Sequence, residues 1–207
     1  MDTKKAIYII RHGETEYNKK GIIQGSGIDS DLNATGILQS QLFYRAYHHI
    51  NFNKIYTSKL KRTIQSVSPF REKGIPVESL DELNEINWGI FEGKAPTPDA
   101  QKAYNRIISE WQQGLLDRQI EGGESPKEIN KRQKAGLLKI MSNAEEETIL
   151  IAMHGRALKC FLCLLTGTPL EEMENFKHNN LCLYHLEYTK EKGFEIIVEN
   201  SLDHLLI

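Results

Sequence analysis

Side chains that can do chemistry follow the first apolar run of the chain. Residues 6–10 are largely apolar, which is typical of a buried strand, and Arg11, His12 and Gly13 come directly after it. A histidine can act as a nucleophile or as an acid–base group near neutral pH. An arginine offers a planar fork that fits phosphate oxygens, and a glycine lets backbone approach a ligand closely. This combination favours chemistry on a phosphoryl group.

Later segments deliver more groups of the same kind. Residues 54–57 predict a second strand, and Arg62 falls in the first turn of the following helix, where free N–H groups and the helix dipole also favour an anion. Residues 148–153 predict a third strand that ends at His154, and Glu85 lies between these two regions. Open α/β sheets bind ligands at the carboxyl ends of their strands, so we expect these side chains to form one compact cationic site.

The pattern of apolar residues predicts the elements that must position them. Expected strands are 6–10, 54–57, 148–153, 181–188 and 194–199, with a weaker one at 77–80; expected helices are 34–49, 59–72, 98–114, 125–142 and 155–166. Alternating strands and helices indicate an α/β fold, a three-layer α/β/α sandwich with a mostly parallel sheet. The last two strands are close enough in sequence to form a hairpin, which makes the sheet mixed.

We expect a single domain over residues 1–207. Residues from about 87 to 123 have no clear place in the sheet, and we interpret them as an insert that covers its C-terminal edge and shapes the pocket. Trp88 and Trp111 in this segment are expected in packing or in the pocket wall. Outside the motifs, His178 lacks a partner pattern and is expected in a surface or core role. Glu14 is expected to pair with a nearby cation.

Composition excludes several classes of protein. A formal net charge of −2 argues against binding of nucleic acid or an anionic membrane by bulk charge. No stretch reaches the roughly 20 apolar residues of a membrane span, and residues 1–5 lead into a strand instead of a signal-peptide core, so a cytoplasmic location is expected. Cys160 and Cys163 have the C-x-x-C spacing, but the chain has no second pair of this kind, which a zinc site needs. We therefore interpret these two residues as core thiols.

The oligomeric state stays open, with a homodimer through the edge hairpin as one option.

The ordered set of motifs resembles the histidine phosphatase superfamily, also called phosphoglycerate mutase-like. The matching segments are R-H-G-E-T at 11–15, S-K-L-K-R-T at 58–63, W-G-I-F-E-G at 88–93 after an acidic residue, G-G-E-S at 122–125 and H-G at 154–155. The resemblance covers nearly the whole chain and implies the phosphoglycerate mutase-like fold.

The resemblance also implies roles for five side chains. His12 would attack phosphorus and become a phosphohistidine, while Arg11, Arg62 and His154 would bind the oxygens of the transferring group. Glu85 would protonate the leaving alkoxide and then help to activate water. For that task Glu85 must be protonated when substrate binds, which requires a raised pKa.

The resemblance implies a second set of residues that hold a small phosphorylated metabolite. Its members are Asn18, Gln24, Gly25, Gly155 and Arg156. It implies no metal ion and no cofactor, because alignment and charge stabilisation supply most of what phosphoryl transfer needs.

The superfamily contains both hydrolases and mutases. The resemblance implies that true mutases carry extra basic residues, including an Arg-Arg pair, in a longer insert. This chain has no Arg-Arg pair, and residues 94–122 hold only scattered cations. We therefore favour a metal-independent phosphatase that acts on small phosphomonoesters. A cofactor-dependent phosphoglycerate mutase and a non-catalytic module that binds a phosphometabolite are the alternatives.

Overall fold

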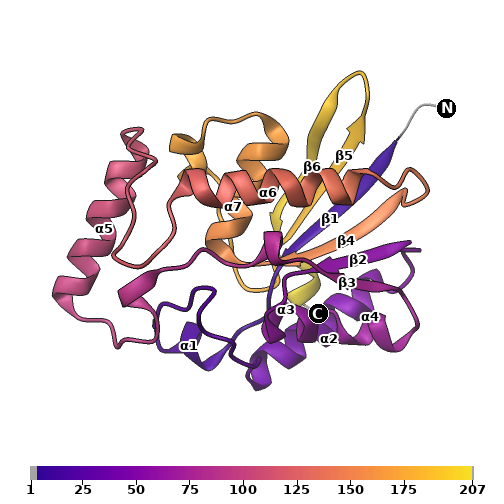
Figure 1. The fold of residues 1–207 in the computed structure, drawn as a ribbon. Helices are drawn as coiled ribbons and strands as arrows, with labels where there is room; N and C mark the ends of the chain where they lie inside the picture. Colours follow the sequence, from indigo (N-terminus) through magenta and orange to yellow (C-terminus); the bar gives the residue numbers. More distant parts are fainter. Residues whose placement is uncertain (1–3, 207) are drawn as a thin grey trace.

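A mixed six-stranded sheet with the order β3-β2-β4-β1-β5-β6 forms the centre of the computed structural model, which describes residues 4–206 (Figure 1). The strands are β1 (Lys5–Arg11), β2 (Lys54–Thr57), β3 (Val77–Ser79), β4 (Thr148–Met153), β5 (Leu183–Thr189) and β6 (Gly193–Ser201). The four strands from β3 to β1 run parallel, whereas β5 is antiparallel to both β1 and β6. The predicted mixed, mostly parallel sheet is confirmed.

Helices cover both faces of this sheet (Figure 1). The α-helices are α1 (Glu16–Lys19), α2 (Ala34–Tyr47), α3 (Lys61–Ser66), α4 (Ser68–Glu72), α5 (Pro98–Gln112), α6 (Pro126–Met141) and α7 (Gly155–Thr166). The short 3₁₀ segments are η1 (Asp81–Leu83), η2 (Gly89–Phe91), η3 (Leu170–Asn175) and η4 (Asp203–Leu205). Among residues 4–206, no helix combines the length and apolar character that a membrane crossing requires.

The apolar run of β4 is explained by burial on both faces. Ile149, Ile151 and Met153 pack in a cluster with α6 and α7, while Leu150 and Ala152 pack on the opposite side with α2 and α4. Side chains alternate across a strand, so a parallel strand covered by helices on both sides is apolar at nearly every position. The predicted three-layer arrangement is therefore confirmed.

Two predicted element boundaries are wrong for local reasons. The helix expected over 59–72 is split into α3 and α4 at Val67, whose φ is −114°. Pro69 lacks the N–H that would continue the helix, and its ring clashes with the preceding turn. The strand expected from residue 181 begins at Leu183, because Leu181 has a left-handed φ of 53° and turns its N–H toward the carbonyl of Arg11.

The register of the parallel strands brings distant residues to one edge. Arg11 at the end of β1 lies opposite Met153 of β4, and Thr57 of β2 lies opposite Ala152. His12, Ser58 and His154 are the next residues along these three strands. They therefore meet at the same C-terminal edge, toward which α1 and α5 also lie (Figure 1).

Candidate active site

A cavity of about 190 Å³ opens at this edge of the sheet. Its lining comes from the loop after β1, the start of α7, the 85–104 region and the segment before β5: Arg11, His12, Asn18, Ile22, Ile23, Gln24, Glu85, Trp88, Gln101, Tyr104, Gly155, Arg156 and His178. The volume lies below the roughly 300–1,000 Å³ of pockets for drug-sized ligands. It therefore suits a small ligand.

His12 lines the cavity and keeps one ring nitrogen unprotonated. Its Nδ1 lies 2.7 Å from the carbonyl oxygen of Gly13. A carbonyl only accepts, so Nδ1 carries the proton and Nε2 keeps its lone pair. The ring is 2% exposed, and this burial, together with the charges of Arg62 and Arg11, holds the pKa of His12 well below its ordinary value of 6.5. His12 is thus a neutral imidazole in the tautomer that a nucleophile requires.

His154 lies beside His12, with 5.2 Å between the ring centroids. Its Nδ1 accepts a hydrogen bond from Nε of Arg62 at 3.2 Å, so its Nε2 carries the proton and donates to Oγ of Ser58 at 2.7 Å. Burial and the charge of Arg62 hold the pKa of His154 well below 6.5. The ring is therefore neutral and fixed in orientation by two partners.

The two arginines occupy different positions. Arg11 lines the cavity, donates Nη1–H to Nδ1 of His178 at 3.1 Å, and has a buried Nε without a partner among residues 4–206. A buried donor without a partner is costly, so Arg11 keeps hydrogen-bonding capacity for a ligand, and Arg11 itself lines the cavity. Arg62 is fully buried and also donates Nη1–H to the carbonyl of Ile28 and Nη2–H to that of Gly25.

Arg62 and His154 are absent from the cavity lining described above. Hydrogen bonds within the protein occupy three of the five N–H groups of Arg62 and both ring nitrogens of His154. Arg62 supplies positive potential at His12, and the neutral ring of His154 packs beside it. Direct contact between these two side chains and a phosphoryl oxygen stays a prediction.

Glu85 is held at the N-terminus of α7. One carboxylate oxygen accepts from the backbone N–H groups of Ala157 at 2.8 Å and Ile86 at 2.9 Å, and the other accepts from that of Arg156 at 3.1 Å. The carboxylate thus occupies the positive end of a helix that has no side-chain cap of its own.

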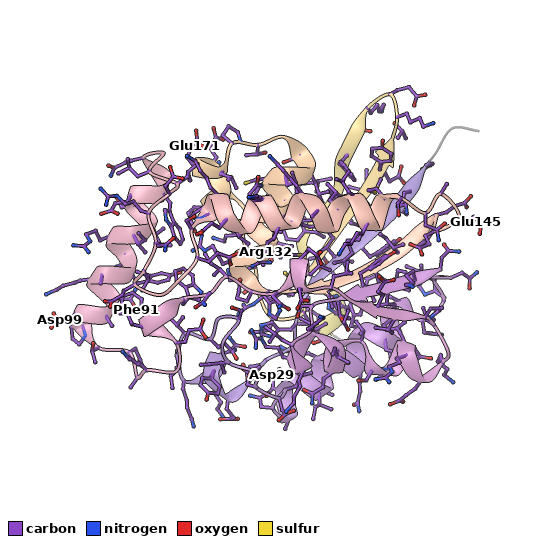
Figure 2. The ribbon with its side chains drawn as sticks, in the orientation of Figure 1. Asp29, Phe91, Asp99, Arg132, Glu145 and Glu171 are labelled. Atoms are coloured by element: carbon purple, nitrogen blue, oxygen red, sulfur yellow. The ribbon has the colours of Figure 1, made fainter. Side chains whose placement is uncertain are left out.

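The backbone at Glu85 is fixed by α6. Arg132, which lies beneath α6 in Figure 2, donates to the carbonyl oxygens of Glu82 and Glu85 and pairs with Glu124. Since α6 packs against α7, this contact holds Glu85 where both helices reach it, and Glu85 lines the same cavity as His12.

The predicted substrate-binding residues fall into two groups. Asn18, Gly155 and Arg156 line the cavity, and so does Gln24, but its amide is bonded to Thr15 and Ser30. The carbonyl of Gly25 accepts from Arg62, and this glycine lies behind the lining. A Cβ on Gly25 would lie 2.0 Å from Oε1 of Glu92, so its function here is close packing.

Three polar residues of the site have no role in the sequence interpretation. His178 lies in the cavity wall against Arg11, contrary to the surface or core role expected for it. Ser58 orients His154, and Asn180 donates to the carbonyl of His12 and to Oδ1 of Asn18. The S-K-L-K-R-T motif contains Ser58, but no pattern singles out His178 or Asn180 before the last two strands.

The segment from 87 to 123 reaches the site from outside the sheet. Trp88, Gln101 and Tyr104 line the cavity, while Trp111 is buried against Trp88; Phe91 and Asp99 mark the course of this segment in Figure 2. Glu14 accepts from the amide of Asn33 instead of pairing with the expected cation. Within residues 4–206, no group of three or more His, Cys, Asp or Glu side chains is arranged to hold a metal ion.

Fold and site together define an α/β protein with a cationic cavity and two histidines at strand ends. The chain belongs to the histidine phosphatase superfamily, branch 1, whose family model matches residues 7–200.

Three relatives show the range of the similarity. A protein of Hydrogenobacter thermophilus named "Putative phosphoserine phosphatase 2" is 29% identical over 97% of both chains. A "Probable phosphoglycerate mutase GpmB" of Yersinia enterocolitica is 30% identical over 88% of this chain and 84% of its own. The crystal structure of the alpha-ribazole phosphatase from Shigella flexneri superposes with a TM-score of 0.83 at 25% identity, covering 95% of this chain and 96% of that one. The relatives thus include both phosphatases and mutases by name.

Proposed function

We propose that this protein is a metal-independent phosphatase that hydrolyses small phosphomonoesters through a phosphohistidine on His12. The observation that carries the proposal is the tautomer of His12: the Gly13 carbonyl holds the proton on Nδ1 and leaves the lone pair on Nε2 of a side chain that lines the cavity. Arg11, which lines the cavity and has hydrogen-bonding capacity left at its Nε, provides positive charge for the phosphoryl oxygens.

The reaction proceeds in two steps. Nε2 of His12 attacks phosphorus, the ester P–O bond breaks, and Glu85, which has to enter this step as the neutral acid, gives its proton to the leaving oxygen. Water then attacks the phosphohistidine, the P–N bond breaks, and Glu85 takes the proton of the water, which restores both groups. The charges of Arg11 and Arg62 stabilise the phosphoryl oxygens in both steps.

The partner we propose is a small phosphorylated metabolite, and we propose neither nucleic acid nor a membrane as a partner. The cavity volume of about 190 Å³ supports a small substrate. A cytoplasmic location and the oligomeric state remain predictions from the sequence.

Hydrolysis of p-nitrophenyl phosphate in the presence of EDTA tests the proposal. We expect release of phosphate by the wild-type protein and its loss in His12→Ala, since that variant lacks the attacking nitrogen. Interconversion of phosphoglycerates after addition of 2,3-bisphosphoglycerate, faster than hydrolysis, would instead support the mutase. Binding of phosphate without turnover of any phosphoester would support the non-catalytic module.

A further inference from the structure

Arg156, the second arginine in the cavity wall, is already paired with a carboxylate, which it shares with Lys159. Glu174 of η3 forms an ion pair with Nη1 of Arg156, and its other oxygen accepts from Nζ of Lys159 at 2.5 Å. Nη2 of Arg156 donates to the hydroxyl of Tyr104 at 3.1 Å. The guanidinium also lies 5.8 and 5.5 Å from the ring centroids of Trp88 and Trp111, so its position is fixed.

Apart from Glu85, which takes part in the proposed reaction, the remaining polar groups in the cavity are uncharged. His178 accepts from Arg11 at Nδ1, which leaves its proton on Nε2, and burial together with the charge of Arg11 lowers the pKa of His178 to about 3. Asn18 and Gln101 contribute amides and Tyr104 a hydroxyl. Once Arg11 is assigned to the phosphoryl group and Glu85 to proton transfer, the rest of the lining offers the leaving group neutral donors, aromatic rings and two isoleucines.

We propose that the substrates are phosphomonoesters of uncharged, hydroxyl-bearing alcohols, and that Glu174 sets this preference by engaging Arg156. This inference depends on the proposed phosphatase function. A carboxylate on the leaving group would lose hydration on entering the cavity and would find its arginine already paired. A hydroxyl group is satisfied by neutral donors and acceptors such as His178, Gln101 and Tyr104.

A matched pair of substrates tests the preference directly. sn-Glycerol 3-phosphate and 3-phosphoglycerate share a three-carbon skeleton and differ by a hydroxymethyl group in place of a carboxylate. We expect kcat/KM of the wild-type protein to be at least tenfold higher for glycerol 3-phosphate. Hydrolysis of both at equal rates, or a preference for 3-phosphoglycerate, overturns the inference. If the protein hydrolyses none of the three compounds, glycerol 3-phosphate, 3-phosphoglycerate and p-nitrophenyl phosphate, the proposed function itself is overturned.

Glu174→Gln tests the assigned cause. The change releases the charges of Arg156 and Lys159, so we expect the ratio of kcat/KM to shift at least fivefold toward 3-phosphoglycerate. Glu172→Gln is the matched control, because it removes the same charge from an exposed position in the same 3₁₀ segment, and its ratio should stay that of the wild type. An unchanged ratio in a folded Glu174→Gln protein contradicts the role of Glu174.

Arg156→Gln supplies a second readout if Glu174→Gln does not fold. Whatever its effect on overall rate, the variant should change the ratio between the two substrates by less than threefold, because the paired charge does not read the leaving group. Selective loss of 3-phosphoglycerate hydrolysis would show that Arg156 recognises a carboxylate and would overturn the inference.

Discussion

Replacement of Glu85 by glutamine separates the two functions of this carboxylate, proton transfer and anchoring of α7. In the wild-type protein its oxygens accept from the backbone N–H groups of Ile86, Ala157 and Arg156. A glutamine oxygen can keep the two shorter bonds, but the amide NH₂ then faces the N–H of Arg156. The hydrogen bond from Arg156 is lost, the other two are no longer charge-assisted, and a buried donor is left opposite another donor.

The structural cost follows from those contacts. A hydrogen bond to a charged group contributes about 1.5–3 kcal/mol, and a carboxylate at a helix N-terminus adds about 0.3–1 kcal/mol. We expect Glu85→Gln to lower the free energy of unfolding by about 2–4 kcal/mol. For a chain of this size that corresponds to a Tm lower by about 4–16 °C, measurable by thermal unfolding.

The catalytic cost depends on the leaving group. General acid catalysis contributes about 10²–10⁴-fold, so kcat of Glu85→Gln should fall by that factor for an alkyl phosphate whose alkoxide needs a proton. p-Nitrophenolate leaves without protonation, so the loss for p-nitrophenyl phosphate should stay below about tenfold.

Equal losses for both substrates would refute the assignment of Glu85 as the proton donor. Glu82→Gln is the control: Glu82 pairs with Lys139 outside the cavity, so its kcat should match the wild type.

Three further outcomes are expected. Ser58→Ala removes the acceptor of His154 Nε2–H, so kcat should fall at least tenfold and the free energy of unfolding by about 1–3 kcal/mol; an unchanged kcat contradicts the orienting role of Ser58. The pKa values of His12, His154 and His178 are lowered in the folded state, that of His178 to about 3, so the unfolded chain takes up protons first as pH falls below 6.5. The free energy of unfolding should then fall by about 1.4 kcal/mol per pH unit for each histidine. The free energy of unfolding, measured with urea between pH 6.5 and 4.5, should fall less steeply with decreasing pH in His178→Asn than in the wild type. An identical dependence on pH in both proteins would contradict the neutral state of His178. Lys5→Met removes two hydrogen bonds, to the carbonyl of Ile140 near the end of α6 and to that of Asn143 just after it. The variant should lose about 1–3 kcal/mol of stability without a change in kcat, whereas a lower kcat would show coupling to the site.

The central sheet could be predicted because its strands are defined locally. The runs ending at Arg11 and His154 are apolar, and the parallel order follows from the helices between them, so the meeting of His12 and His154 was predictable. The break between α3 and α4 had a local signal in Pro69 that the apolar pattern concealed. The arrangement of Arg62 had none, because its partners at Gly25 and Ile28 lie in an irregular loop.

The part of the cavity wall that Arg156 and His178 form depends on tertiary packing. His178 enters the cavity because η3 packs on α7 and the chain then turns at Leu181. Arg156 is predicted by its place after His154, but its pairing with Glu174 joins two segments 18 residues apart. Such contacts have no period or motif in the sequence, so the character of the leaving-group site becomes visible only in the folded chain.

Trapping of the phosphorylated intermediate tests the central claim most directly. A steady-state reaction with p-nitrophenyl phosphate, quenched in alkali to preserve phosphohistidine, would be digested and analysed by mass spectrometry, with ³¹P NMR to identify the modified nitrogen. The account predicts a phosphoryl group on Nε2 of His12 that is absent from His12→Asn. A phosphoryl group on another residue during turnover, or an active His12→Asn variant, would contradict the role of His12 as the nucleophile.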